Sequence, residues 1–200
     1  MRRTFKPLLF VLCLVPTAVL LYRAASHGLG ANPIKAITHF TGDWTLYFLL
    51  ITLALTPLRR VTGYTAHMRY RRMLGLFAFY YACLHFLTYL VLDQFFDWHA
   101  IVADIAKRPY ITVGFAAFVL LIPLAVTSNQ RMMQRLGRNW RRLHRLVYPI
   151  VGLGILHYLW LVKADIREPV LFGLVFTLLM LLRIPYVRLQ QKARLMRSSS

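Results

Sequence analysis

The chain has 200 residues, of which 58% are hydrophobic, and its mean hydropathy is +0.54. This exceeds what a soluble domain needs to fill a core, so the excess apolar surface must face a membrane. The formal net charge of +19 raises nucleic acid as a partner. However, the arginines flank apolar segments and form no separate basic domain, so we expect membrane lipid and no nucleic acid.

Six apolar segments follow one another along the chain, and each approaches or reaches the roughly 17 to 25 residues that cross a bilayer as a helix. They are residues 8–22, 41–58, 73–92, 110–126, 146–162 and 170–187. Because lipid offers the backbone no hydrogen-bond partners, these segments must be helical, and the short links favour antiparallel neighbours. We therefore predict an all-α fold, a six-helix transmembrane bundle that forms one domain over residues 1–200.

Charged residues divide between alternate links. All six acids lie in or beside the first, third and fifth links: Asp43, Asp93, Asp97, Asp104, Asp165 and Glu168. Clusters of arginine and lysine occupy the N-terminus, the second and fourth links and the C-terminal end. The positive-inside rule then predicts that both termini are cytoplasmic and that the acidic links face outward.

Motifs for export and for cysteine chemistry are weak. Arg2 and Arg3 before an apolar run resemble a twin-arginine signal, but five more segments follow, so we interpret them as the anchor of a retained first helix. Cys13 and Cys83 lie inside segments and form no C-x-x-C motif, so we expect no disulfide, zinc site or covalent haem. We recognise no internal repeat.

Histidines inside a bilayer are functional candidates because ionisable side chains are costly there. Four of the seven lie in or near the links and are interpreted as ordinary surface residues: His27, His39, His67 and His99. His85 and His157 instead lie well inside the third and fifth segments, both roughly 9 to 12 Å below the outer boundary at about 1.5 Å per residue. Two imidazoles at matched depth predict a b-type haem held between them, the alternative being hydrogen-bonded core histidines.

A third candidate histidine marks the inner end of the fifth segment. His144 precedes His157 by thirteen residues, or about 20 Å of helix, and the position at matching depth on the third segment is Arg71 or Arg72. Arginine is too basic to bind iron, so Arg71 is expected to pair with a haem propionate or a flavin phosphate. We thus predict one or two haems, with His85, His144 and His157 as metal ligands and Arg71 as a cofactor-binding residue.

Five motifs together are typical of one known family: Gly42-Asp43-Trp44, Thr56-Pro57-Leu58-Arg59, Arg71-Arg72-Met73-Leu74-Gly75-Leu76, Trp140-x-x-Leu143-His144-Arg145-Leu146-x-Tyr148 and His157-Tyr158-x-Trp160. The chain resembles, over nearly all its length, the haem-binding membrane subunits of bacterial periplasmic methionine-sulfoxide reductase systems, the MsrQ or YedZ family. That family is similar to the transmembrane half of ferric reductases and NADPH oxidases, which stack two haems between paired histidines. This chain has arginine where the fourth histidine would be.

The resemblance implies an electron-transfer subunit of an oxidoreductase system in the bacterial inner membrane, rather than the catalytic subunit. Electrons would come from the quinone pool or from a cytoplasmic flavin reductase, with FMN as a possible cofactor. They would pass to a periplasmic molybdopterin methionine-sulfoxide reductase subunit that repairs oxidised proteins.

Two sequence observations limit the donor and the alternatives. A nicotinamide domain is not expected, because Gly28-x-Gly30 lies in a short link and Gly152-x-Gly154 in an apolar segment. The alternatives are a quinone-linked cytochrome b that serves another oxidoreductase, a small transporter that uses its histidines to relay protons or bind a metal ion, and a purely structural membrane subunit.

Overall fold

The computed structural model describes residues 5–162 and 164–183, and this part of the chain is entirely helical with connecting turns. The helices are α1 (Phe5–Ala25), α2 (Pro33–Thr62), η1 (Ala66–Tyr70), α3 (Arg71–Leu87), η2 (Thr88–Asp93), α4 (Trp98–Lys107), α5 (Pro109–Val126), α6 (Gln130–Leu136), α7 (Arg138–Leu143), η3 (His144–Leu146), α8 (Val147–Leu161) and α9 (Arg167–Leu181). Lys163, Arg2, Arg3 and the basic residues after Arg183 lie outside the described residues.

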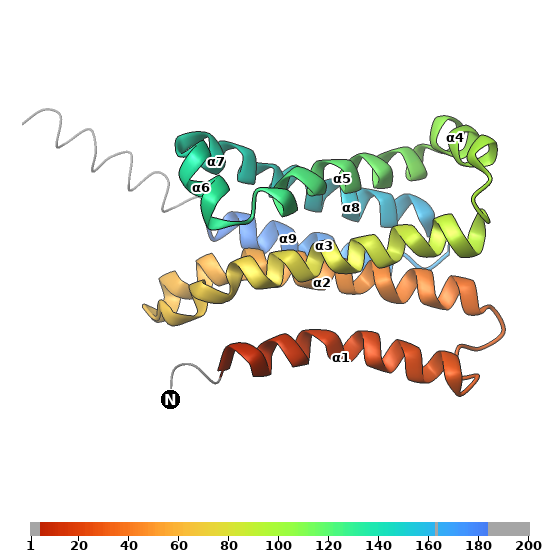
Figure 1. The fold of residues 1–200 in the computed structure, drawn as a ribbon, viewed down its shortest axis with the longest axis horizontal. Helices are drawn as coiled ribbons and strands as arrows, with labels where there is room; N and C mark the ends of the chain where they lie inside the picture. Colours follow the sequence, from red (N-terminus) through yellow and green to blue (C-terminus); the bar gives the residue numbers. More distant parts are fainter. Residues whose placement is uncertain (1–4, 163, 184–200) are drawn as a thin grey trace, which may run out of the picture.

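The long helices run side by side and alternate in direction (Figure 1). Each predicted apolar segment overlaps one of them over its described residues. Three helical stretches, Phe5–Ala25, Ala66–Asp93 and Pro109–Val126, are long and apolar enough to cross a membrane. The prediction of an all-helical membrane protein is thereby confirmed at this level.

Short helices that the apolar pattern did not predict occupy the links (Figure 1). The α4 helix begins where the Asp97 carboxylate accepts a hydrogen bond from the Ala100 backbone N–H at 3.0 Å. The α6 helix begins in the same way, with the Asn129 side chain accepting from the Met132 N–H at 2.8 Å. Both caps satisfy N–H groups that a helix start leaves without partners. The links with α4 and with α6 and α7 lie at opposite ends of the bundle, which separates the acidic links from the arginine-rich ones.

A ring of four helices forms the centre of the bundle. Helix α2 packs mainly on α3 and α5 mainly on α8, while further contacts join α2 to α8 and α3 to α5. Tyr81 of α3 is fully buried, stacks on Phe48 of α2 and donates its hydroxyl to the Cys13 carbonyl of α1 at 2.8 Å. Helix α1 is thus fixed to the ring, and α9 covers α2 and α8 from another side.

A proline in α2 is compensated by an arginine that follows α9. Pro57 has no N–H to donate to the Leu53 carbonyl one turn earlier, so that oxygen loses its helical partner. The buried guanidinium of Arg183 donates to this oxygen and to the Tyr148 hydroxyl of α8, the latter at 2.5 Å. One side chain therefore joins α2, α8 and the end of α9 at the arginine-rich end.

Candidate cofactor site

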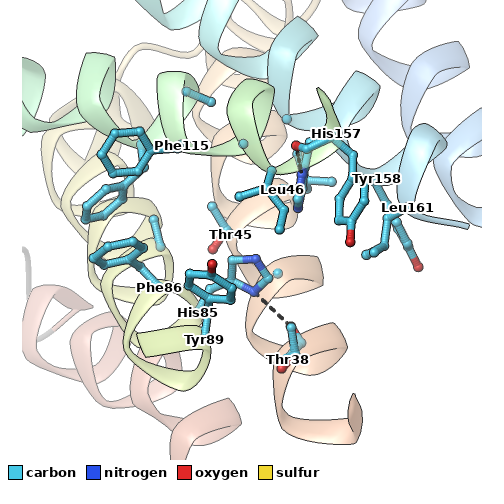
Figure 2. A pocket seen from close by; sticks show the side chains of 18 of the residues that line it. Thr38, Thr45, Leu46, His85, Phe86, Tyr89, Phe115, His157, Tyr158 and Leu161 are labelled. Carbon is cyan, nitrogen blue, oxygen red and sulfur yellow. Dashed lines mark hydrogen bonds between the residues drawn. The ribbon is translucent and has the colours of Figure 1, made fainter. Parts of the chain in front are cut away.

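Two imidazoles from diagonal helices of the ring face one another. His85 on α3 and His157 on α8 have ring centres 6.1 Å apart, and their planes meet at 81°. Both line a cavity of about 260 Å³ enclosed by α2, α3, α5 and α8 (Figure 2). The cavity lies toward the acidic end of the bundle, because Asp93 and Arg108 from the third link also line it.

Each imidazole is oriented by a backbone carbonyl of a neighbouring helix. Nδ1 of His85 lies 2.9 Å from the Thr38 oxygen of α2, and Nδ1 of His157 lies 2.7 Å from the Tyr110 oxygen of α5. A carbonyl can only accept, so Nδ1 carries the proton and donates it in both rings. The lone pair of each neutral ring is therefore on Nε2, the nitrogen that remains available to bind a metal.

The walls of the cavity are apolar and largely aromatic. Phe86 of α3 stacks on Phe118 of α5, with ring centres 4.8 Å apart and planes at 20°. Figure 2 shows Phe86 and Phe115 on one side of the cavity and His157 and Tyr158 on the other. Aliphatic and small side chains complete the lining: Leu46, Leu49, Ala82, Ile111, Ala117, Leu121 and Ile150. Such walls suit a flat apolar molecule.

Polar groups in and beside the cavity carry charges of both signs. Tyr158 donates its hydroxyl to Glu168 at the start of α9, and Asp43 lies beside the same phenol. Arg108 is the only arginine or lysine among the described residues that line the cavity, and its Nε lies 3.1 Å from the Asp104 carboxylate. A hydrogen bond with Tyr110 and the Asp104 charge raise the pKa of Arg108 above its ordinary value, so it remains a cation.

One lining residue was misjudged from the sequence. His39 was interpreted as an ordinary surface histidine because it precedes the second apolar segment, but α2 already begins at Pro33. The side chain is half-buried, lines the cavity and contacts the Tyr158 ring edge-on at 6.0 Å. The Pro-Ile pair after Asn32, an N-terminal helix signal, marks this earlier start.

His144 and Arg71 form a second group at the opposite end of the bundle. His144 lies in the turn η3 before α8, with its ring centre 3.9 Å from that of Trp140. The Thr127 hydroxyl donates to the Pro123 carbonyl at 2.6 Å, so it accepts from Nε2 of His144 at 3.2 Å. Burial and the positive charge of the half-buried Arg71 lower the pKa of His144. The four predicted site residues therefore divide into two pairs, one at each end.

The donor set at the cavity fits a metal inside a macrocycle better than a bare ion. Over the described residues, no group of three or more histidine, cysteine, aspartate or glutamate side chains is arranged to hold a metal ion. Two imidazoles could instead hold an iron whose remaining ligands a porphyrin supplies. Two metal–imidazole bonds of about 2 Å each, with the distance from each nitrogen to its ring centre added, separate the ring centres by roughly 6 Å. The observed 6.1 Å fits that arrangement.

Comparison with known proteins identifies the class and then the family. Residues 41–155, which include α3, α5 and most of α8, match the family described as ferric reductase like transmembrane component. Three relatives carry the name protein-methionine-sulfoxide reductase heme-binding subunit MsrQ. The relative from Herminiimonas arsenicoxydans is 55% identical over 90% of this chain and 84% of its own length. The relative from Rhodospirillum rubrum is 54% identical over 92% of this chain and 90% of its own length. The relative from Xanthomonas campestris pv. campestris is 57% identical over 78% of this chain and 71% of its own length.

The chain therefore belongs to the ferric reductase-like transmembrane proteins and, among them, to the MsrQ family. No solved structure matches the chain.

Proposed function

We propose that this chain is a transmembrane b-type cytochrome that passes electrons to a methionine-sulfoxide reductase catalytic subunit. The observation that carries the proposal is the His85–His157 pair, whose Nδ1 atoms are both engaged and whose ring spacing suits one iron. The name of the relatives, which states heme binding and protein-methionine-sulfoxide reductase, supports the same cofactor and the same system.

The residues at the cavity divide the work of holding a haem. His85 and His157 would bind the iron, and the stacked Phe86 and Phe118 would give the haem an apolar contact surface. Arg108 would pair with a propionate, since within residues 5–162 and 164–183 it is the only arginine or lysine that lines the cavity. Haem would supply reversible one-electron exchange at this position.

The proposed topology has six membrane spans, both termini in the cytoplasm and the protein in the bacterial inner membrane. The segregation of arginines and acids between opposite ends of the bundle supports it. The His85–His157 cavity then lies near the periplasmic face. There, the acidic links would meet the catalytic subunit, which we expect to be a periplasmic molybdopterin enzyme.

The inner pair is the proposed entry point for electrons. Arg71 and the neighbouring arginines present positive charge to the cytoplasm, which suits the phosphate of FMN delivered by a flavin reductase or an approaching quinol. Trp140, packed on His144, offers an aromatic surface beside this charge. For His144 to bind an inner haem through Nε2, it would have to leave Thr127, so a second haem requires a rearrangement that the outer site does not need.

Electron delivery tests the proposal directly. Purified protein in nanodiscs is reduced anaerobically and then mixed with the purified catalytic subunit and a methionine-sulfoxide peptide. Haem oxidation should depend on both additions and should yield methionine in proportion to the electrons delivered. Reoxidation at the same rate without the catalytic subunit, or an absence of haem, would overturn the proposed function.

A further inference from the structure

The two candidate ligands are held by the same local arrangement, used twice. In each case, the histidine donates Nδ1–H to a carbonyl that precedes it by 47 residues, from Thr38 to His85 and from Tyr110 to His157. In each case, a glycine follows that carbonyl by one helical turn, at Gly42 and at Gly114. The carbonyl, the glycine and the histidine thus occur twice, and each member of the second set follows its counterpart in the first set by the same number of residues.

The sequence around the histidines repeats at the same offset. Leu84-His85-Phe86-Leu87 matches Leu156-His157-Tyr158-Leu159, with only the aromatic residue changed. No internal repeat was recognised in the sequence, and the match around the two histidines corrects that interpretation at these positions. Three identical residues in four gave too weak a signal until the shared hydrogen bond identified their register.

The helix packing has the same twofold correspondence. The pair α2–α3 corresponds to the pair α5–α8, and these are the two most extensive contacts in the ring. Exchanging the pairs also exchanges the α2–α8 contact with the α3–α5 contact, and both are present. A cofactor between α3 and α8 would therefore meet the same ligand, carbonyl and glycine on each of its two faces.

The glycines are needed because the imidazoles lie directly against them. A Cβ at position 114 would lie 2.6 Å from Nδ1 and 2.9 Å from Cε1 of His157, closer than such atoms approach. A Cβ at position 42 would lie 3.2 Å from both Nδ1 and Cε1 of His85, a milder overlap. At Gly152 of α8, by contrast, the space is open, since a Cβ there would meet nothing within 4 Å.

We propose that the cofactor site consists of two equivalent half-sites, and that Gly42 and Gly114 are positioning residues for His85 and His157. Each glycine lets the imidazole lie on the neighbouring helix and reach the carbonyl one turn earlier. This hydrogen bond fixes the ring plane and the nitrogen presented to the metal. The inference rests on the proposed haem function and adds the residues that set ligand geometry.

The structure predicts a graded effect of alanine at these positions. Gly114→Ala must displace the His157 ring and break its 2.7 Å hydrogen bond, and loss of such a supporting contact weakens metal-site affinity by roughly 10- to 100-fold. Gly42→Ala requires the His85 ring to move by only a few tenths of an ångström, so its haem affinity should fall less than tenfold. Gly152→Ala on α8 is the matched control and should leave haem affinity unchanged.

Haem affinity and the EPR spectrum of the ferric protein together test the proposal. The EPR signal of a bis-imidazole haem depends on the angle between the ligand planes, whereas a general loss of folding lowers its intensity without moving it. We expect the signal to shift in Gly114→Ala, to shift less in Gly42→Ala and to stay in place in Gly152→Ala. The Gly42 variant keeps the test open should Gly114→Ala fail to fold.

The outcomes separate this inference from the proposed function. Wild-type protein with haem, together with unshifted signals and unchanged affinities in both glycine variants, would overturn the positioning role and leave the cytochrome in place. Wild-type protein that binds no haem would overturn both.

Discussion

The hydrogen bond between Tyr158 and Glu168 should stabilise the outer end of the cofactor site. Tyr158 follows His157 on α8, is 8% exposed and donates its hydroxyl to the carboxylate at the start of α9. Tyr158→Phe removes this bond and leaves the ring packing in place. A hydrogen bond to a charged group contributes about 1.5 to 3 kcal/mol. Because Glu168 is exposed and water can replace the lost donor, we expect about 1 to 2 kcal/mol.

For a chain of this length that loss lowers the apparent Tm by roughly 2 to 8 °C. The assay is thermal unfolding of detergent-purified protein, monitored by tryptophan fluorescence. Tyr22→Phe, at a tyrosine that is 73% exposed, is the control. A double-mutant cycle with Glu168→Ala isolates the pair, since the double variant should lose less than the sum of the single losses. A Tyr158→Phe shift no larger than that of Tyr22→Phe, or additive losses in the cycle, would refute the reasoning.

Three further predictions concern the inner end and the topology. Burial and the charge of Arg71 lower the pKa of His144, so as the pH falls the imidazole is protonated in the unfolded chain before it is protonated in the folded protein. The free energy of unfolding is therefore highest above the unfolded pKa of about 6.5 and falls as the pH drops below it. His144→Gln should flatten that fall in thermal unfolding measured across pH, and an unchanged slope would contradict the assignment. NADPH alone should leave the haem oxidised under anaerobic conditions, whereas a flavin reductase with FMN, or a quinol, should reduce it; prompt reduction by NADPH alone would reveal an unrecognised nicotinamide site. A C-terminal alkaline phosphatase fusion should be inactive because the proposed topology places the C-terminus in the cytoplasm, and an active fusion would contradict that topology.

The helical architecture was predictable because membrane solvent imposes it residue by residue. Long apolar runs bounded by charges define the helices, and the backbone has no other way to satisfy its hydrogen bonds in lipid. The short helices α4 and α6 were missed because they depend on single capping residues, Asp97 and Asn129, in segments too short and too polar for that pattern. The early start of α2 at Pro33 was missed for the same reason, which hid the position of His39.

The candidate site was predictable only in part. Depth along the helices selected His85 and His157, because residue rise fixes how far each lies from the charged boundary. Depth contains no information about which helix carbonyl each ring reaches, so Thr38, Tyr110 and the two glycines emerged only from tertiary packing. For His144, depth gave its end of the bundle but could not reveal that Thr127 occupies its Nε2 atom.

The central claim is that one haem iron is bound by His85 and His157, and the EPR spectrum of the purified ferric protein tests it most directly. Planes that meet at 81° predict a low-spin bis-imidazole haem with the large g-value typical of nearly perpendicular ligands. His85→Ala and His157→Ala should each abolish that signal, and His99→Ala, at an exposed histidine in α4, should keep it. A wild-type spectrum retained in both His85→Ala and His157→Ala, or wild-type protein without haem, would contradict the account.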